Sequence, residues 1–176
     1  MNTPPGAIDL YLAPGQFHFS SGPARMRTLL GSCIAIILWH PVHNIGGLCH
    51  CMLPYRARRG AELDGRYVDE ALALFQQEIV AHQTTLEEYQ LKLFGGGEMF
   101  PEQRRDLMGS NVAHMNVAAA HELAAQSGLT PKSQDLGGLG HRTLIFDTWS
   151  GHVWVRHTSL KTAEGNDEKN KGTGRR

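Results

Sequence analysis

The 176-residue sequence predicts an α+β fold, a mixed β-sandwich flanked by helices. Three observations predict it. Short β-branched or alternating apolar runs, typical of strands, occur along most of the chain. One longer stretch carries apolar residues at three- and four-residue steps, as amphipathic helices do, and a second is bounded by a helix-capping residue and a terminating glycine. The strands and helices do not alternate regularly, which argues against a doubly wound parallel sheet.

Strand patterns dominate the first third of the chain. The run Cys33–Trp39 is almost wholly apolar and rich in isoleucine, which suits a strand covered on both faces. Pro41 to Asn44 is typical of a turn, so this run and the next one should form a hairpin. The predicted strands here are Ile8–Leu12, Gln16–Phe19, Met26–Leu30, Cys33–Trp39 and Ile45–Leu53.

The remaining two thirds mix helices and strands. After an exposed loop from Arg56 to Arg66, a helix begins near Tyr67, with Asp69 and Glu70 favourable in its first turn. A second helix runs from about Asn111 to Gln126; Ser110 or Asn111 caps it and Gly128 ends it. The other predicted strands are Gln90–Phe94, Leu129–Gln134, Thr143–Asp147 and Val153–Arg156.

These elements form a single domain over residues 8–156. Residues 1–7, with Pro4, Pro5 and Gly6, are predicted to be a flexible arm. Residues 157–176 hold only one large apolar residue, Leu160, and are predicted to be a disordered tail.

Composition excludes several classes of function. Lysine plus arginine (17) equal aspartate plus glutamate (17), so no net charge favours a nucleic-acid partner. No apolar run approaches the roughly 20 residues that span a bilayer, and no secretion signal opens the chain, so we expect a cytoplasmic protein that does not insert into membranes. Three cysteines make a poor disulfide framework and are predicted to be free thiols.

Cys33 and His50 are the candidate catalytic pair. If the hairpin turn centres on Pro41 and Val42, opposed residues have numbers that sum to about 83, so Cys33 faces His50 with Cβ atoms about 4.5–5.5 Å apart. A register error of one residue would separate them. A thiol and an imidazole at this distance suit nucleophilic catalysis, and a charged histidine or exposed amides would lower the thiol pKa. The alternative is a structural cysteine in an apolar strand.

The residues around the pair supply further candidates. Gly31 permits a close approach, and the amide of Cys33 could face a substrate carbonyl. Thr28 and Ser32 are the candidates for a third group that orients the histidine. Gly95 to Gly97 form a tight turn that shapes a pocket wall, and Asn111 is either a helix cap or a substrate contact.

A metal site is the rival interpretation of Cys49-His50-Cys51, with His40 and His43 nearby. Consecutive strand residues point to opposite faces, so Cys49 and Cys51 share one face while His50 takes the other. We therefore predict no metal. His40 and His43 are predicted to be exposed turn residues, and His114 and His121 to lie on the surface of a helix.

Five segments of the sequence are informative when taken together: Thr28 to Cys33, Gly46 to Pro54, Lys92 to Gly96, Gly109 to Asn111 and Asp135 to Arg142. Together they resemble the CheD family, the chemoreceptor glutamine deamidases. The resemblance implies that Cys33 is the nucleophile and His50 its base, with Thr28 as the third catalytic residue and no cofactor. It adds weight to Gly31, Ser32, Gly96 and Asn111 as substrate-binding candidates. Cys49 and Cys51 depart from the polar and aromatic residues usual beside the family's histidine.

The resemblance also implies a fold, a substrate and partners. The fold is similar to the catalytic domain of cytotoxic necrotizing factor toxins. The substrate is a glutamine side chain on the cytoplasmic helices of methyl-accepting chemotaxis receptors, and a CheC-type phosphatase is a further partner in some members. A binding module that docks on these partners without turnover is the alternative function.

Overall fold

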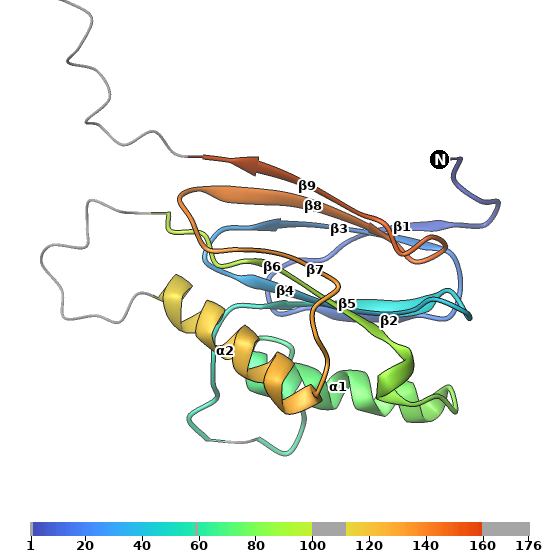
Figure 1. Cartoon of the computed structure of the whole chain (residues 1–176), viewed down its shortest axis with the longest axis horizontal. Coiled ribbons are helices and arrows are strands. Elements are labelled where there is room, and N and C mark those ends of the chain that lie inside the picture. The colour runs from blue at the N-terminus through green and yellow to red at the C-terminus, as the bar shows by residue number, and fades with distance from the viewer. Residues whose placement is uncertain (1, 59, 100–111, 160–176) are drawn as a thin grey trace, which may run out of the picture.

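Two β-sheets lie face to face, and two helices cover the outer face of one of them (Figure 1). The computed structural model describes residues 2–58, 60–99 and 112–159. The predicted α+β class, with two sheets of mixed strand direction and helices beside them, is confirmed.

The first sheet has four strands in the order β1-β3-β8-β9. β1 runs parallel to β3, whereas β3, β8 and β9 are antiparallel neighbours. The strand bounds are Ile8–Tyr11 for β1, Ala24–Leu30 for β3, His141–Asp147 for β8 and Val153–Thr158 for β9.

The second sheet has five strands in the order β2-β5-β4-β6-β7. Its centre is antiparallel, while β7 at the edge runs parallel to β6. The strand bounds are Phe17–Ser20 for β2, Ile34–His40 for β4, Ile45–Cys51 for β5, Gln90–Gly95 for β6 and Ser133–Leu136 for β7.

Helices α1 (Val68–Ala81) and α2 (Val112–Ser127) lie on the five-stranded sheet, and a short 3₁₀ helix, η1 (Leu86–Glu88), precedes β6. The predicted cap of α2 at Ser110 or Asn111 lies outside the described residues. None of the described helices is long and apolar enough to cross a membrane.

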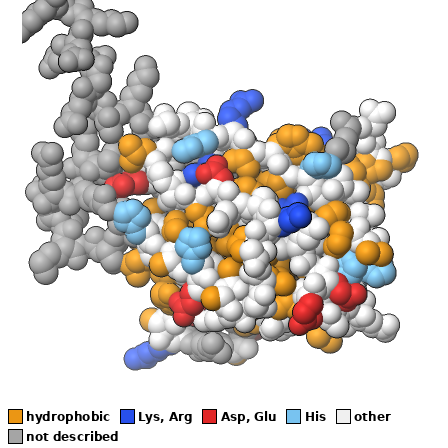
Figure 2. Space-filling view, in the orientation of Figure 1, with side chains coloured by type: hydrophobic (Ala, Val, Ile, Leu, Met, Phe, Trp, Pro, Cys, Tyr) orange, Lys and Arg blue, Asp and Glu red, His pale blue; other side chains and the backbone are white. Residues whose placement is uncertain are grey.

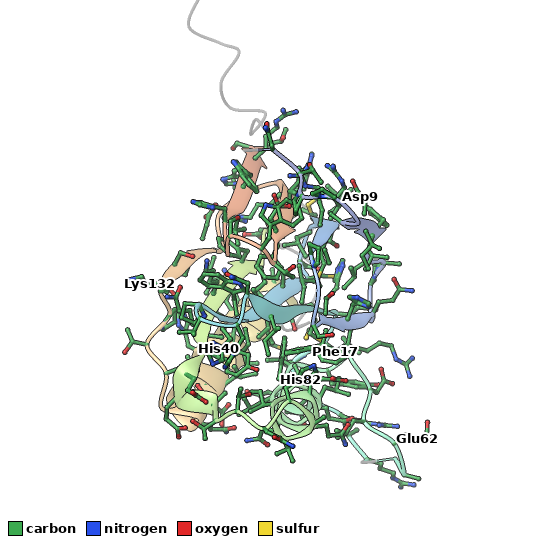
Figure 3. All side chains as sticks on the ribbon, turned by 90° about the vertical axis from the view of Figure 1, so that its right-hand side faces the viewer. Asp9, Phe17, His40, Glu62, His82 and Lys132 are labelled. Carbon is green, nitrogen blue, oxygen red and sulfur yellow. The ribbon has the colours of Figure 1, made fainter. Side chains whose placement is uncertain are left out.

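The centre of the five-stranded sheet is buried on both faces, so the sheet separates two cores. One lies between the sheet and the helices, and the other between the two sheets. In Figure 3, Phe17 lies on the helix side of the sheet, close to His82 at the end of α1. The ring of Phe17 contacts that of Phe75, with 5.0 Å between the centroids. All seven residues of β4 and all seven of β5 are buried, as the apolar run of β4 predicted.

Two predictions about this frame are wrong. The strand predicted over Leu129–Gln134 is β7, which begins at Ser133. Leu129 instead packs against the core under the helices before the chain pairs with β6. His40 is not an exposed turn residue. It ends β4, is buried, and its ring meets that of Tyr89 at 5.1 Å.

Charged side chains are spread thinly over the visible surface. Figure 2 shows lysine, arginine, aspartate and glutamate side chains standing among neutral ones on the face drawn in Figure 1. Two arginines of the four-stranded sheet form salt bridges, Arg25 with Asp147 and Arg27 with Asp9. This distribution agrees with the equal numbers of acidic and basic residues in the sequence.

Candidate active site

The β4–β5 hairpin places Cys33 and His50 on one face, but in a different register from the predicted one. Ala35, not Cys33, lies opposite His50, and the ladder ends at the pair Ile34 and Cys51. The register shift is two residues, because four residues from Pro41 to Asn44 form the turn between the paired ends of the strands. Side chains alternate with a period of two, so a two-residue shift keeps both residues on the same face.

This face looks toward the four-stranded sheet. Cys33, one residue before β4, packs against the core between the sheets, together with Ala35 and Ile37 of β4. Leu48, two residues before His50, belongs to the same core. The pair therefore lies between the two sheets, at the end where β4 begins and β5 finishes.

The loop that carries Cys33 is held by backbone hydrogen bonds from the glycine turn after β6. Gly96 donates its N–H to the carbonyl of Cys33, and Gly97 donates to the carbonyl of Gly31, each at 2.8 Å. In contrast, the N–H groups of Ser32 and Cys33 donate to no carbonyl of the described residues. A substrate oxygen could therefore accept from them.

His50 is held by Thr28 and Leu12. The hydroxyl of Thr28 donates to the carbonyl of Leu12 at 2.8 Å and lies 2.7 Å from Nδ1 of His50. A hydroxyl has one proton, so Thr28 must accept from His50 when it donates to Leu12. Nδ1 therefore carries the imidazole proton, with the carbonyl of Leu12, 3.5 Å away, as its second acceptor.

This tautomer leaves Nε2 of His50 with its lone pair free. Nε2 is buried and has no hydrogen-bond partner among the described residues, and no hydrogen bond links it to the sulfur of Cys33. Burial lowers the pKa of His50, and the contact with the Leu12 carbonyl opposes this only in part. A neutral imidazole with a free Nε2 can accept a proton from a thiol or a water molecule.

Burial raises the pKa of the Cys33 thiol, the opposite of the direction expected if a charged histidine lay beside it. The lowered pKa of His50 agrees with this, because a neutral imidazole does not stabilise a thiolate. Both shifts favour the neutral forms, a thiol at Cys33 and an uncharged imidazole at His50.

Cys49 and Cys51 lie on the other face of β5, as strand alternation predicted. Both are fully buried in the core beneath the helices. The thiol of Cys49 donates to the carbonyl of Gly65 at 3.4 Å, and the two sulfurs are 3.5 Å apart. The five-stranded sheet thus separates these thiols from Cys33.

The predicted substrate contacts have different surroundings. Gly31 lies beside Met99, and the carbonyl of Ser32 accepts from a helix side chain. Gly96 has a φ of +67°, and its N–H is already bound to the carbonyl of Cys33, so in this structure it holds the loop that carries Cys33. Asn111 lies outside the described residues.

Asn116, whose side chain makes that contact with Ser32, is not among the site residues predicted from the sequence. It is fully buried on α2 and also donates to the carbonyl of Met52, both bonds being 2.9 Å long. The signal in the sequence was a polar residue within the apolar face of a helix, since its buried neighbours on α2 are alanine and leucine.

Comparisons with known proteins identify the family. The family profile described as "CheD chemotactic sensory transduction" matches residues 52–157. The "Probable chemoreceptor glutamine deamidase CheD" of Pseudomonas syringae pv. tomato is 52% identical, over 93% of this chain and 98% of its own length. Proteins with the same printed name in Pseudomonas syringae pv. syringae and Pseudomonas fluorescens are 54% and 51% identical, over 93% and 91% of this chain and 93% and 90% of their own lengths. An alignment of that extent includes Cys33 and His50, and the chain belongs to the CheD family.

Proposed function

We propose that this protein deamidates glutamine side chains of methyl-accepting chemotaxis receptors, converting them to glutamate through a thioester on Cys33. The proposal is supported by its relatives, which are named as probable chemoreceptor glutamine deamidases. The observation that carries it is the buried His50, held with its proton on Nδ1 and its Nε2 free on the face that Cys33 shares.

The proposed reaction begins with a neutral thiol. Nε2 of His50 takes the proton of Cys33 as the sulfur attacks the carboxamide carbon of the substrate glutamine, and the carbon–oxygen double bond becomes an oxyanion. The imidazolium then gives this proton to the leaving nitrogen, so ammonia departs and a thioester remains. Nε2 next takes a proton from water, which attacks the thioester and releases glutamate and the thiol.

Thr28 acts on His50 rather than on the substrate. Its hydroxyl accepts from Nδ1 and so stabilises the positive charge that the ring carries after each proton transfer. The carbonyl of Leu12 supports the same proton from 3.5 Å. We assign Thr28 as the group that sets the tautomer of the base.

We propose that the N–H groups of Ser32 and Cys33 receive the oxyanion. Gly31 and Gly96 are assigned to the loop that presents these groups, and Asn111 to substrate contact. No cofactor takes part in the proposed cycle.

Three further assignments rest on family membership. We propose that the cytoplasmic helices of the receptors are the substrate surface, that a CheC-type phosphatase is a further partner, and that the protein is cytoplasmic. We also propose that the fold is similar to the catalytic domain of cytotoxic necrotizing factor toxins. Its two stacked sheets with helices over one face support this likeness.

The test is deamidation of a purified receptor cytoplasmic fragment, followed by peptide mass spectrometry. We expect the wild type to convert receptor glutamines to glutamates and Cys33→Ala to convert none. Cys51→Ala, which removes a thiol from the opposite face of the sheet, is the matched control and should stay active. If wild type and Cys33→Ala bind the fragment but leave its mass equally unchanged, the protein is a binding module and the enzymatic proposal is wrong.

A further inference from the structure

We infer that Asn116 is a positioning residue that orients the peptide between Ser32 and Cys33, so that the N–H of Cys33 faces the oxygen of the reacting carboxamide. This inference rests on the proposed deamidase function. It extends that function to a residue on a helix behind the sheet.

The hairpin strands separate at the site, and Asn116 lies where they part. The last ladder pair is Ile34 with Cys51. Beyond it, the carbonyl of Cys33 takes the N–H of Gly96, and the N–H of Met52 donates to the carbonyl of Arg66 at 2.8 Å. The carbonyls of Ser32 and Met52 are then outside the ladder, and the side-chain amide of Asn116 donates to both.

The two bonds fix the direction of the side-chain amide. Both acceptors are carbonyl oxygens, so only the NH₂ group of Asn116 can face them. Its Oδ1 is buried and has no partner among the described residues. Leaving a buried acceptor unsatisfied is unfavourable, and an apolar residue would avoid this at a position where α2 otherwise buries alanine and leucine. The asparagine is therefore explained by its two donor bonds.

The bond to Ser32 also sets the direction of the next N–H. The peptide between Ser32 and Cys33 is planar and trans, so its C=O and N–H point in opposite directions. Holding the carbonyl toward α2 turns the N–H of Cys33 away from the helix. That N–H donates to no carbonyl of the described residues, so it can donate to the oxygen on which negative charge develops.

The bond to Met52 anchors the asparagine to the residue that directly follows β5, the strand that carries the base. Met52 follows His50 by two residues, and its own N–H is bound to Arg66. Asn116 thus connects the peptide between Ser32 and Cys33 to the backbone that follows β5. One side chain therefore fixes the orientation of the Cys33 N–H relative to the Met52 backbone, which is itself held by Arg66.

Two chemical reactions of Cys33 separate this role from a general structural one. Deamidation needs both the proton acceptor and the oxyanion donor. Alkylation by iodoacetamide occurs at a saturated carbon and forms no oxyanion, so it depends on the thiol and its base alone. A residue that orients only the N–H should affect the first reaction and leave the second unchanged.

The experiment compares Asn116→Leu and Asn116→Ala with Leu123→Ala, a truncation on the buried face of the same helix. We expect kcat on the receptor fragment to fall about 10- to 100-fold in both Asn116 variants, with KM within about twofold of wild type. The alkylation rate of Cys33 should stay within about threefold. Leu123→Ala should lose stability but keep its kcat.

Several outcomes would overturn the inference. The role is wrong if both Asn116 variants keep kcat within about twofold of wild type. It is also wrong if alkylation falls in proportion to kcat, or if Leu123→Ala loses as much kcat, because either result means that the helix only holds the site together. A wild type that deamidates nothing would overturn the proposed function and this inference with it.

Discussion

Replacing Thr28 with valine is the sharpest test of how the base is prepared. Valine has nearly the same shape as threonine, so the change removes a hydroxyl without opening a cavity. The hydroxyl is buried and joins His50 to the Leu12 carbonyl through contacts of 2.7 and 2.8 Å. In the variant, the proton on Nδ1 of His50 has only the Leu12 carbonyl as acceptor, 3.5 Å away.

The size of the effect follows from these contacts. A neutral hydrogen bond contributes about 0.5–1.5 kcal/mol, so a weaker hold on the tautomer and on the imidazolium should lower kcat about 2- to 12-fold. A buried group left unsatisfied costs about 1–3 kcal/mol of folding free energy. In a protein of this size that corresponds to a fall in Tm of roughly 2–12 °C. KM should not change, because the Thr28 hydroxyl is buried and its contacts are with His50 and the Leu12 carbonyl.

The assay is deamidation of the receptor fragment under saturating conditions, with Tm measured by circular dichroism. Thr28→Ser is the matched control, since it keeps the hydroxyl and loses one methyl group. We expect the serine variant to retain kcat within about twofold of wild type while the valine variant does not. If the two variants have equal kcat once the folded fraction is accounted for, the tautomer argument is refuted.

Three other predictions follow from burial and backbone geometry. Because burial raises the pKa of Cys33, its iodoacetamide rate should still be rising at pH 9.0, and a plateau near neutral pH would instead indicate a thiolate–imidazolium pair. Burial lowers the pKa of His50 and of His18, a partly buried residue of β2. In acid, the unfolded chain therefore binds more protons than the folded protein. The free energy of unfolding from urea titrations should therefore decrease as pH falls below about 6.5, and a flat profile would contradict neutral buried rings. Gly96→Ala should destabilise the fold more than Gly137→Ala in the same titrations. Both glycines have a positive φ, but only at Gly96 would a Cβ lie 2.3 Å from another side chain. Equal losses of unfolding free energy in the two variants would contradict this reasoning.

Local patterns were enough for the class of fold and for most of its elements. Apolar runs bounded by turn residues predict strands, three- and four-residue spacing predicts the first helix, and capping residues predict the second, because these patterns follow from backbone geometry. The same reasoning placed Cys49 and Cys51 on the face opposite His50, since strand alternation does not depend on what packs against the strand.

The sequence alone determined the family and the face that Cys33 and His50 share, while the tertiary structure decided how that face works. The hairpin register depended on turn length, and a two-residue shift does not change side-chain alternation. The link from Thr28 to His50 joins strands of different sheets, so only the stacking of the sheets brings them within 2.7 Å. Asn116 contacts the loop that carries Cys33 from a helix some 80 residues later in the chain, and no periodic pattern in the sequence predicts such a contact. Spacing along one strand is local information, whereas the surroundings of a catalytic pair depend on which distant elements pack against it.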